Sequence, residues 1–307
     1  MQIDEQITFR KLEIFLSFID LGNMTRVAEA TGLSVVSVHR ALHSLEEGVQ
    51  CPLFRRDGRK LIPLASAYAL AEHAKIAVRH CLQGIEKARQ ASGFASDRLR
   101  VGALYSLTLR TIPTLLTGLR GRRPEVEVDL VLSSNRALLK KLADGELDAI
   151  VIAVDEAGVP PELQSVQVFE DAMWFAAPRK SPFAKRHEID LREFTAAEFV
   201  SLSDDFATYH DFARAFQIAG FEPRITMKVG DIFSLINLVS GGIGYALLPG
   251  RVADFSTQIQ LIPLAEPYAL RQQIRLLFQR NRERDPNLLS LAAECRLFRR
   301  GASETAA

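Results

Sequence analysis

MTRVAEATGLSVVSVHRALHSLEEGVQCPLFRRDGRK, residues 24–60, is the stretch of sequence that decides the fold. A short helix, capped by Asn23 or Thr25, runs into a tight turn at residues 31–33, where Gly32 can adopt a positive φ. Ser34 then caps a second helix over residues 35–47. Two helices joined by a short glycine turn predict a helix-turn-helix. The inward-facing residues of the pair are Val27, Ala28, Ala30, Val38, Leu42 and Leu45.

A hydrophobic helix precedes this motif and a basic hairpin follows it. Asp57-Gly58 between two apolar stretches is a strong hairpin signal. Four cations lie at the tip of this hairpin, which is therefore interpreted as a wing. The cations are Arg55, Arg56, Arg59 and Lys60, and the preceding helix buries Phe9, Leu12, Phe15, Leu16 and Ile19.

The composition is that of a globular protein with no bulk charge. The 307 residues predict about two domains at roughly 150 residues each. Lys plus Arg number 38 and Asp plus Glu number 37, so the net charge is +1. Contact with nucleic acid must therefore depend on a local basic patch.

Cysteine usage and hydropathy predict a soluble, cytoplasmic protein. Three cysteines lie far apart with no CxxC, which excludes a zinc ribbon and fits a reducing compartment. The N-terminus is too polar for a secretory signal, and no apolar run reaches the ~18–20 residues of a membrane span. His39 and His43 are four residues apart, but no third ligand is evident, so no metal is predicted. Residues 241–244 contain GxG before a strand, which indicates a turn and no nucleotide cofactor.

The rest of the chain alternates strand and helix patterns typical of α/β units. A long helical pattern covers residues 66–93, and a closing helix is predicted at residues 286–299. Strands are predicted at residues 99–104, 126–132, 149–153, 173–177, 199–202, 224–229, 244–247 and 271–279.

Residues 24–30, 33–34, 38–40, 45–46 and 53–56 resemble the winged helix-turn-helix of LysR-type transcriptional regulators. Four later motifs fall where that family has them, so the resemblance covers nearly the whole chain. These are residues 99–102 (LRVG), 123–126 (RPEV), 145–148 (GELD) and 242–249 (GIGYALLP). Residues 37–48 and 230–235 are similar to the subgroup that regulates malonate-utilisation genes.

The resemblance implies an α/β architecture in three parts. A winged helix-turn-helix would occupy residues 1–65 and a linker and dimerisation helix residues 66–95. A two-subdomain effector domain of periplasmic-binding-protein type would occupy residues 96–300. Its subdomain I would take about 97–165 and 270–300, and subdomain II about 170–264, with crossings near 165–170 and 264–270. Residues 301–307 are predicted to be a disordered tail.

The DNA-reading residues are predicted on the second helix and the wing. Arg40 is the first candidate for a bidentate guanine or phosphate contact, the alternative being a solvated surface arginine. The family usually has Gln at Val35, Ser at His39 and Thr at Leu64, so the DNA site is expected to differ and Ser66 to cap the linker helix. Thr25, Ser34 and Ser37 could bind phosphate or simply cap helices. The full candidate set is Thr25, Ser34, Val35, Val36, Ser37, His39, Arg40, His43, Arg55, Arg56, Arg59 and Lys60.

An apolar stripe on the linker helix predicts a coiled-coil seam, with packing against its own domain as the alternative. A two-fold dimer would match an interrupted palindromic operator. The resemblance implies a dimer of dimers, with double-stranded DNA, a small-molecule effector and RNA polymerase as candidate partners. The stripe is Leu70, Ala74, Ala77, Cys81, Ile85 and Ala88.

Polar residues at four strand-to-helix junctions are the candidates for binding a small carboxylate effector, possibly malonate. Arg110 is the nearest cation, and its alternative role is a surface ion pair. Asp204, Asp205 and Asp231 would repel a dianion unless they point away. For the hydroxyls, the alternative is ordinary N-capping. The set is Tyr105, Ser106, Thr108, Arg110, Ser133, Ser134, Asn135, Ser203, Phe206 and Thr208.

The leading hypothesis is therefore a DNA-binding regulator switched by a small carboxylate, with no cofactor and no catalytic residues. The alternatives are a regulator of another small-acid pathway, an enzyme of the binding-protein fold, or a plain solute-binding protein. No Ser-His-Asp elbow, paired metal ligands or phosphate loop supports the enzyme. The missing signal and the helix-turn-helix oppose the solute-binding protein.

Overall fold

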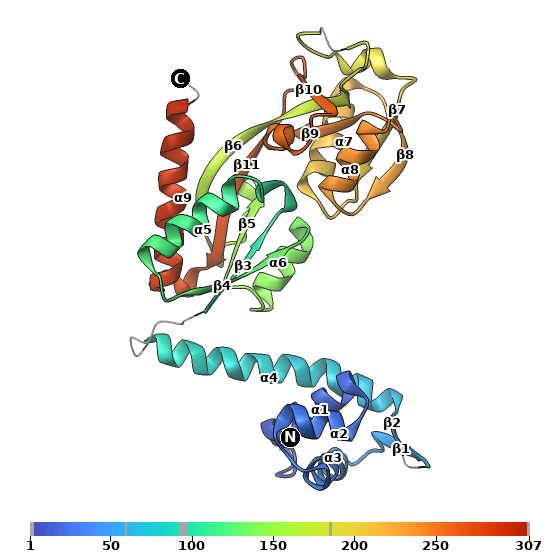
Figure 1. Cartoon of the computed structure of the whole chain (residues 1–307), viewed down its shortest axis with the longest axis vertical. Coiled ribbons are helices and arrows are strands. Elements are labelled where there is room, and N and C mark those ends of the chain that lie inside the picture. Colours follow the sequence, from blue (N-terminus) through green and yellow to red (C-terminus); the bar gives the residue numbers. More distant parts are fainter. Residues whose placement is uncertain (1–2, 59, 92–97, 184–185, 306–307) are drawn as a thin grey trace. The chain divides into compact units, whose positions relative to one another are not determined.

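Apolar residues at helical spacing form the first three helices, α1 (Phe9–Leu21), α2 (Met24–Thr31) and α3 (Val35–Val49). They belong to the first of two compact units, Met1–Gly93 and Phe94–Ala307. The computed structural model describes residues 3–58, 60–91, 98–183 and 186–305 (Figure 1). Within these ranges, no helix combines the length and the apolar character needed to cross a membrane.

Polar caps and glycines set the ends of these helices. Asn23 caps α2 by accepting from the backbone N–H of Thr25 at 2.8 Å, so Thr25 is not the cap. Ser34 caps α3 by accepting from the Ser37 N–H at 3.1 Å, as predicted. Gly32 joins the two helices with a φ of 68°, a left-handed value that favours glycine.

The predicted wing is confirmed as a two-stranded hairpin of β1 (Phe54–Asp57) and β2 (Lys60–Pro63). Asp57 pairs with Lys60, and Gly58 between them has a φ of 59°. Arg59 lies outside the described residues. Helix α4 (Ala65–Ala91) follows, and the prediction that Ser66 caps it is wrong, because Ser66 lies inside the first turn and its hydroxyl donates to the Pro52 carbonyl.

A single core fixes the wing and the start of α4 to the three helices. The Phe54 ring packs edge-on against Phe15 and Phe18, with ring centroids 6.1 and 5.6 Å apart. Ala67, Ala71 and Ala74 of α4 are buried in the same core, and Leu70 packs against it. The N-terminal part of the predicted seam therefore faces its own unit, whereas Ala77, Ile85 and Ala88 are exposed.

The second unit alternates strands and helices, as predicted. Its strands are β3 (Arg98–Ala103), β4 (Glu127–Leu132), β5 (Ala149–Ala153), β6 (Leu163–Pro178), β7 (Glu198–Leu202), β8 (Arg224–Val229), β9 (Ala246–Pro249), β10 (Ile259–Pro263) and β11 (Arg271–Gln279). Its α-helices are α5 (Thr111–Arg122), α6 (Asn135–Ala143), α7 (Ala207–Ala219), α8 (Ile232–Ser240) and α9 (Pro286–Thr305).

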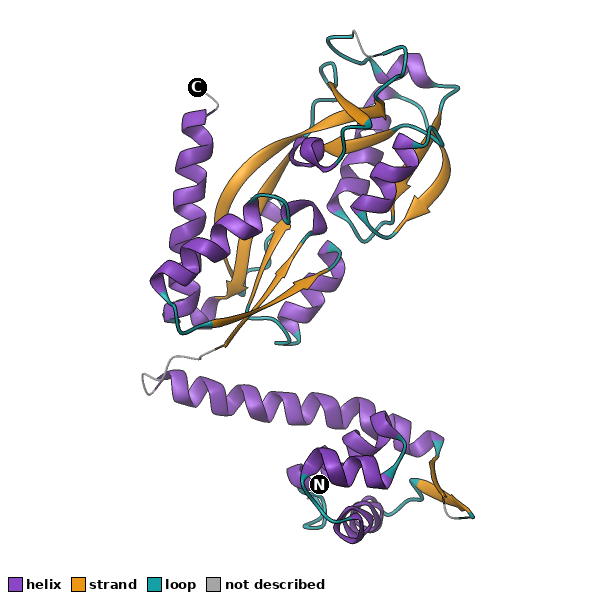
Figure 2. Ribbon diagram, viewed as in Figure 1, coloured by secondary structure: helices purple, strands orange, loops and turns teal. Residues whose placement is uncertain are grey.

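Subdomain I is built on a sheet in which strand β5 is buried on both faces. Strand β3 pairs in parallel with β4 on one side and β5 on the other, and all five residues of β5 are buried. Because the chain first crosses from β3 to β4 and then back past β3 to β5, right-handed crossovers place α5 and α6 on opposite faces. Helix α9 packs against α5 and β6 (Figures 1 and 2).

Two long antiparallel strands join subdomain I to subdomain II, which confirms the predicted two-crossover fold (Figure 1). Strand β6 pairs with β11 as far as Ala172 and then with β9 and β10 from Met173 onward. The change of partner lies just after the predicted crossing at residues 165–170. Strands β7 and β8 form a separate parallel pair in subdomain II.

Three elements differ from the prediction. Strand β6 begins at Leu163, ten residues before the predicted strand at residues 173–177, because it includes the predicted crossing near residues 165–170. Strand β10 was not predicted, because its sequence IQLIP is short and ends in proline. Helix α9 continues to Thr305, so the prediction of a disordered tail is wrong for residues 301–305, and residues 306–307 lie outside the described residues. The added turns continue the helix that starts at Pro286.

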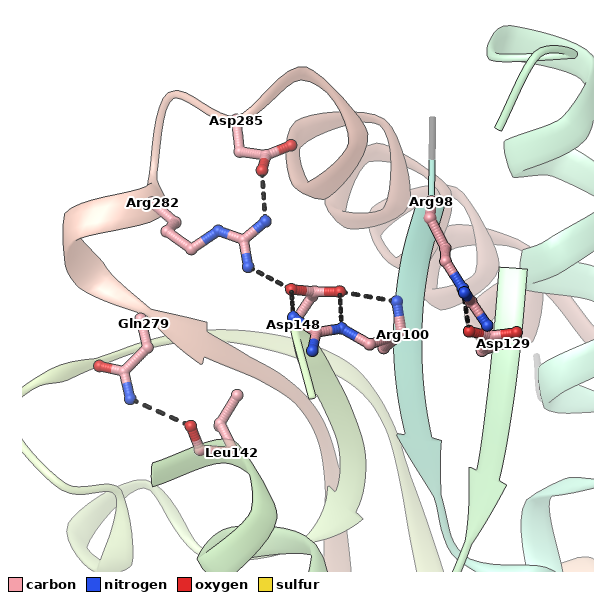
Figure 3. A network of polar contacts seen from close by, with 8 residues as sticks. All are labelled: Arg98, Arg100, Asp129, Leu142, Asp148, Gln279, Arg282 and Asp285. Atoms are coloured by element: carbon pink, nitrogen blue, oxygen red, sulfur yellow. Dashed lines mark hydrogen bonds and ion pairs between the residues drawn. The ribbon is translucent and has the colours of Figure 1, made fainter. Parts of the chain in front are cut away.

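A buried carboxylate ties the ends of three elements together in subdomain I (Figure 3). Asp148, with 2% of its side chain exposed, accepts from the backbone and guanidinium of Arg100 on β3 and from Arg282. Arg282 also pairs with Asp285 at 2.6 Å, just before α9. Burial acts to raise the pKa of Asp148, but Arg100 and Arg282 outweigh it and hold this pKa below the ordinary value of 3.8.

Replacing Asp148 by Asn should lower the free energy of unfolding by about 3–5 kcal/mol at pH 7, because two arginines lose a buried partner. Since the folded-state pKa is depressed, the contribution of Asp148 is fully present above pH 3.8 and is lost as the pH falls through the folded value. Urea unfolding between pH 3 and pH 7 measures both effects.

Asp129→Asn is the matched control, because the Asp129–Arg98 pair is solvent-exposed. It should change the free energy of unfolding by about 1 kcal/mol or less. Equal effects of the two variants would contradict the role given to Asp148.

Candidate nucleic-acid interface and effector site

The outward face of α3 presents both apolar and cationic side chains. Val38, Leu42 and Leu45 are buried, which turns Val36 and Arg40 to the opposite side. Val36 is 68% exposed and Val35 is also exposed. The Arg40 guanidinium has no hydrogen bond or ion pair with any residue that the structure describes. Arg40 is thus an exposed cation near the start of the helix, with no partner among the described residues.

The wing contacts α3 through an arginine–histidine hydrogen bond. The Arg56 guanidinium lies 3.3 Å from His39 Nε2, and because a guanidinium only donates, Nε2 is the acceptor. His43 packs edge-on against His39 and lies 3.6 Å from Glu47. In the described ranges, no group of three or more His, Cys, Asp or Glu residues could hold a metal ion.

The hydroxyl of Ser34 caps the start of α3. Ser34 accepts from the Ser37 backbone, and the two hydroxyl oxygens lie 2.8 Å apart. The side chain of Thr25 is left exposed, because Asn23 caps α2. Arg55, Arg56 and Lys60 of the wing are all exposed. A basic hairpin therefore lies beside the free face of α3.

Glu46 orients the wing, a role that the sequence analysis missed. Its Oε1 accepts from the backbone N–H groups of Leu53 at 2.7 Å and Phe54 at 3.0 Å. These groups begin β1, so one carboxylate of α3 sets where the hairpin starts. The sequence shows Glu46 only as part of the helix-turn-helix motif, and its pattern does not indicate a contact with Leu53, seven residues later.

In the second unit, two of the predicted junctions contact each other directly. Asn135, at the start of α6, donates to the Ala153 carbonyl at 2.7 Å and accepts from the Ala207 N–H at the start of α7 at 3.1 Å. Arg136 pairs with Asp205 at 2.8 Å and lies 3.6 Å from Asp204. The aspartates expected to repel a dianion are thus paired with a cation across the two subdomains.

A buried arginine that the sequence analysis did not single out joins two predicted effector residues. Arg251, on the 3₁₀ helix η4 (Gly250–Phe255), donates from Nε to Ser106 Oγ at 2.9 Å and pairs with Asp171 at 3.0 Å. Its third contact, at 2.8 Å, is Gln272 on β11, which in turn donates to Thr208 Oγ1 at 3.3 Å. Burial lowers the pKa of Arg251, and Asp171 counters that effect. The sequence signal was a lone cation after the apolar run of residues 245–249.

Ser106 and Arg110 line a cavity of about 670 Å³, within the size range of small-molecule sites. Phe169, Arg251 and Phe298 line it as well. Arg110 is exposed, and the carboxylates of Glu170 and Asp254 share the cavity with it.

The remaining predicted effector residues have different surroundings. Thr108 donates to the Tyr105 carbonyl at 2.7 Å, and the Tyr105 ring contacts Phe233 of α8. Ser134 caps α6, and Phe206 is buried in the core of subdomain II. Ser133 and Ser203 are partly exposed. Asp231 caps α8 by accepting from the Ser234 N–H at 2.8 Å, so its carboxylate is directed to the start of its own helix.

Two family models match the chain almost from end to end. The bacterial regulatory helix-turn-helix protein model of the lysR family matches residues 9–67, and the LysR substrate binding domain model matches residues 92–298. The chain belongs to the LysR family. It is a LysR-type DNA-binding transcriptional regulator, as the motifs of residues 24–60 predict.

The chain is also similar to two named transcriptional regulators and to a solved structure with DNA. The chain is 48% identical, over 97% of both chains, to a malonate utilization transcriptional regulator of Klebsiella pneumoniae. It is 27% identical to the Hca operon transcriptional activator HcaR of Escherichia coli, over 83% of this chain and 86% of that one. The crystal structure of full-length CbnR with its target DNA has the same fold, with a TM-score of 0.73 at 20% identity over 95% of this chain and all of that one.

Glu46→Ala should destabilise the LysR-type DNA-binding unit by about 1–3 kcal/mol, because two part-buried N–H groups lose their acceptor. Thermal unfolding followed by circular dichroism measures this change. The neighbouring variant Glu47→Ala is the control, since the Glu47 side chain is exposed and its carboxylate pairs only with His43 among the described residues. Identical melting temperatures for the two variants would contradict the role of Glu46.

Proposed function

We propose that this regulator controls genes of malonate utilisation and that malonate is its effector. The observation that carries the proposal is the 48% identity, over nearly the full length, to the malonate utilization regulator of Klebsiella pneumoniae. Two stretches of the sequence, residues 37–48 and 230–235, also resemble that subgroup. A regulator of another small-acid pathway is the alternative that the ligand experiment below distinguishes.

On DNA, α3 enters the major groove and Arg40 makes the main base contact. Arg40 is suited to this role because it is exposed and has no partner in the described part of the chain. Val36 lies one turn before Arg40, and both Val36 and Val35 are exposed and can pack on thymine methyl groups. The flanking contacts to base or backbone come from Thr25, Ser34, Ser37, His39 and His43, and from Arg55, Arg56, Arg59 and Lys60 of the wing.

The protein binds an interrupted palindrome as a dimer, or as a dimer of dimers. The support is the exposed apolar surface on the C-terminal part of α4, where Leu82 and Ile85 are both about half exposed. Ala77 and Ala88 lie on the same part of the helix and would let two helices approach closely. Leu70 and Ala74 are excluded from this seam because they pack on their own core.

The effector lies between the two subdomains, where the hydroxyls of Ser106, Ser133, Ser203 and Thr208 and the starts of α6 and α7 favour a carboxylate. Binding there shifts the population between two arrangements of the subdomains. Asn135 and Arg136 already link these subdomains, so they contribute to the energy difference between the arrangements.

Arg40→Ala should weaken specific DNA binding by about 1–3 kcal/mol, the value of a good bidentate base contact. A fluorescence-anisotropy titration at fixed salt, on the promoter fragment beside the gene and on scrambled duplex, measures the loss. Arg224→Ala is the control, because it removes an equal charge from an exposed site in the other unit. Unchanged operator affinity of Arg40→Ala would contradict the base contact.

Malonate should raise the melting temperature of the full-length protein, since a ligand that binds only the native state stabilises it by mass action. The measurement is a thermal-shift screen with C3 and C4 dicarboxylates, followed by DNA titration with and without the acid. A shift with another acid and none with malonate would overturn the effector assignment and leave the regulator assignment intact.

A further inference from the structure

Arg251 and Gln272 together determine the direction of four hydrogen bonds. The Arg251 side chain is 7% exposed and its guanidinium carries donors only. Ser106 Oγ and Gln272 Oε1, at 2.9 and 2.8 Å, are therefore acceptors. With its oxygen facing Arg251, the Gln272 amide turns Nε2 to the other side.

Both hydrogens of Gln272 Nε2 are donated to other side chains. It donates to Asp211 Oδ2 at 2.6 Å and to Thr208 Oγ1 at 3.3 Å. The Thr208 oxygen is thus also an acceptor within the protein. Arg251 and the Gln272 amide therefore make both hydroxyl oxygens acceptors, one in each subdomain.

Each of these hydroxyls keeps a proton to donate. Ser106, on the 3₁₀ helix η1 (Tyr105–Leu107), is 8% exposed and Thr208, on α7, is 7% exposed. In the part of the chain that the structure describes, neither hydroxyl proton has an acceptor. Because a buried donor without a partner costs free energy, an acceptor supplied by a ligand is favoured at both positions.

We propose that Arg251 and Gln272 are positioning residues that hold Ser106 and Thr208 as donors, so that the effector site selects ligands presenting acceptor-only groups to both subdomains. This inference rests on the proposed function, which places both hydroxyls at the effector. It favours the dicarboxylate of the proposed function, because a carboxylate carries acceptors only.

The charges around the pair are compatible with a dianion. Asp171 neutralises Arg251 at 3.0 Å. Burial raises the pKa of Asp211, although the hydrogen bond from Gln272 acts to lower it. Gln272 itself is neutral, so it orients Thr208 without adding a charge to the site.

The test is Gln272→Glu in the full-length protein, measured by isothermal titration calorimetry. The introduced carboxylate can still accept from Arg251 but cannot donate, so Thr208 turns its proton to this carboxylate and becomes an acceptor toward the ligand. The probes are two monoanions of equal charge, malonamate and monomethyl malonate. The amide end of the first carries donors as well as an acceptor, whereas the ester end of the second carries acceptors only.

Relative to the wild type, Gln272→Glu should shift the preference from the ester toward the amide. Thr208→Val, which removes the hydroxyl, should weaken malonate binding by about tenfold and abolish the preference between the two monoanions. Adding Gln272→Glu to Thr208→Val should then change this preference no further. Because the two probes carry the same charge, the extra negative charge of the introduced carboxylate cancels in the comparison.

An unchanged ester-to-amide ratio in Gln272→Glu would overturn the inference while malonate binding by the wild type upholds the proposed function. If the wild type binds a different acid instead of malonate, the proposed function fails and the amide and ester of that acid decide the inference. Far-UV circular dichroism spectra of both variants that match the wild type show that the fold is intact.

Discussion

A charge removed from water destabilises a protein by several kcal/mol unless it is paired and hydrogen-bonded, and the second unit meets this requirement at several places. Arg251 is satisfied by residues from η1, β6 and β11. Arg275, 6% exposed on β11, contacts Glu156 at 3.1 Å and Ser165 at 3.0 Å. Asp148 similarly holds β3 to the segment before α9. Buried charges therefore determine which segments, distant in sequence, stay together.

The DNA-binding unit is held together mainly by apolar contacts and not by buried charges. Its core is hydrophobic, and the aromatic contacts of Phe54 fix the wing to α1. Polar groups act at the edges of this core, where Ser34 and Asn23 begin helices and Glu46 begins the wing. None of these internal contacts uses Arg40, which leaves its side chain for the DNA contact proposed above.

Local patterns in the sequence predicted the elements well, because helix caps, glycine turns and hydrophobic periodicity act over a few residues. The helix-turn-helix, the wing and the alternation of strands and helices are confirmed on that basis. Arg251, Gln272 and Glu46 were missed because their partners lie 7 to 145 residues away. The seam on α4 was partly wrong because an apolar stripe does not tell which partner it packs against.

Strands β6 and β11 also define how the two subdomains can move. They run antiparallel and are hydrogen-bonded along their shared length, with one shift of register between Ile274 and Arg275. From Ile274 onward β11 also pairs with β5, so only its first three residues and their β6 partners form a two-stranded ribbon. This short ribbon has no third strand beside it, so it is the part of the link between the subdomains that can bend and twist most readily.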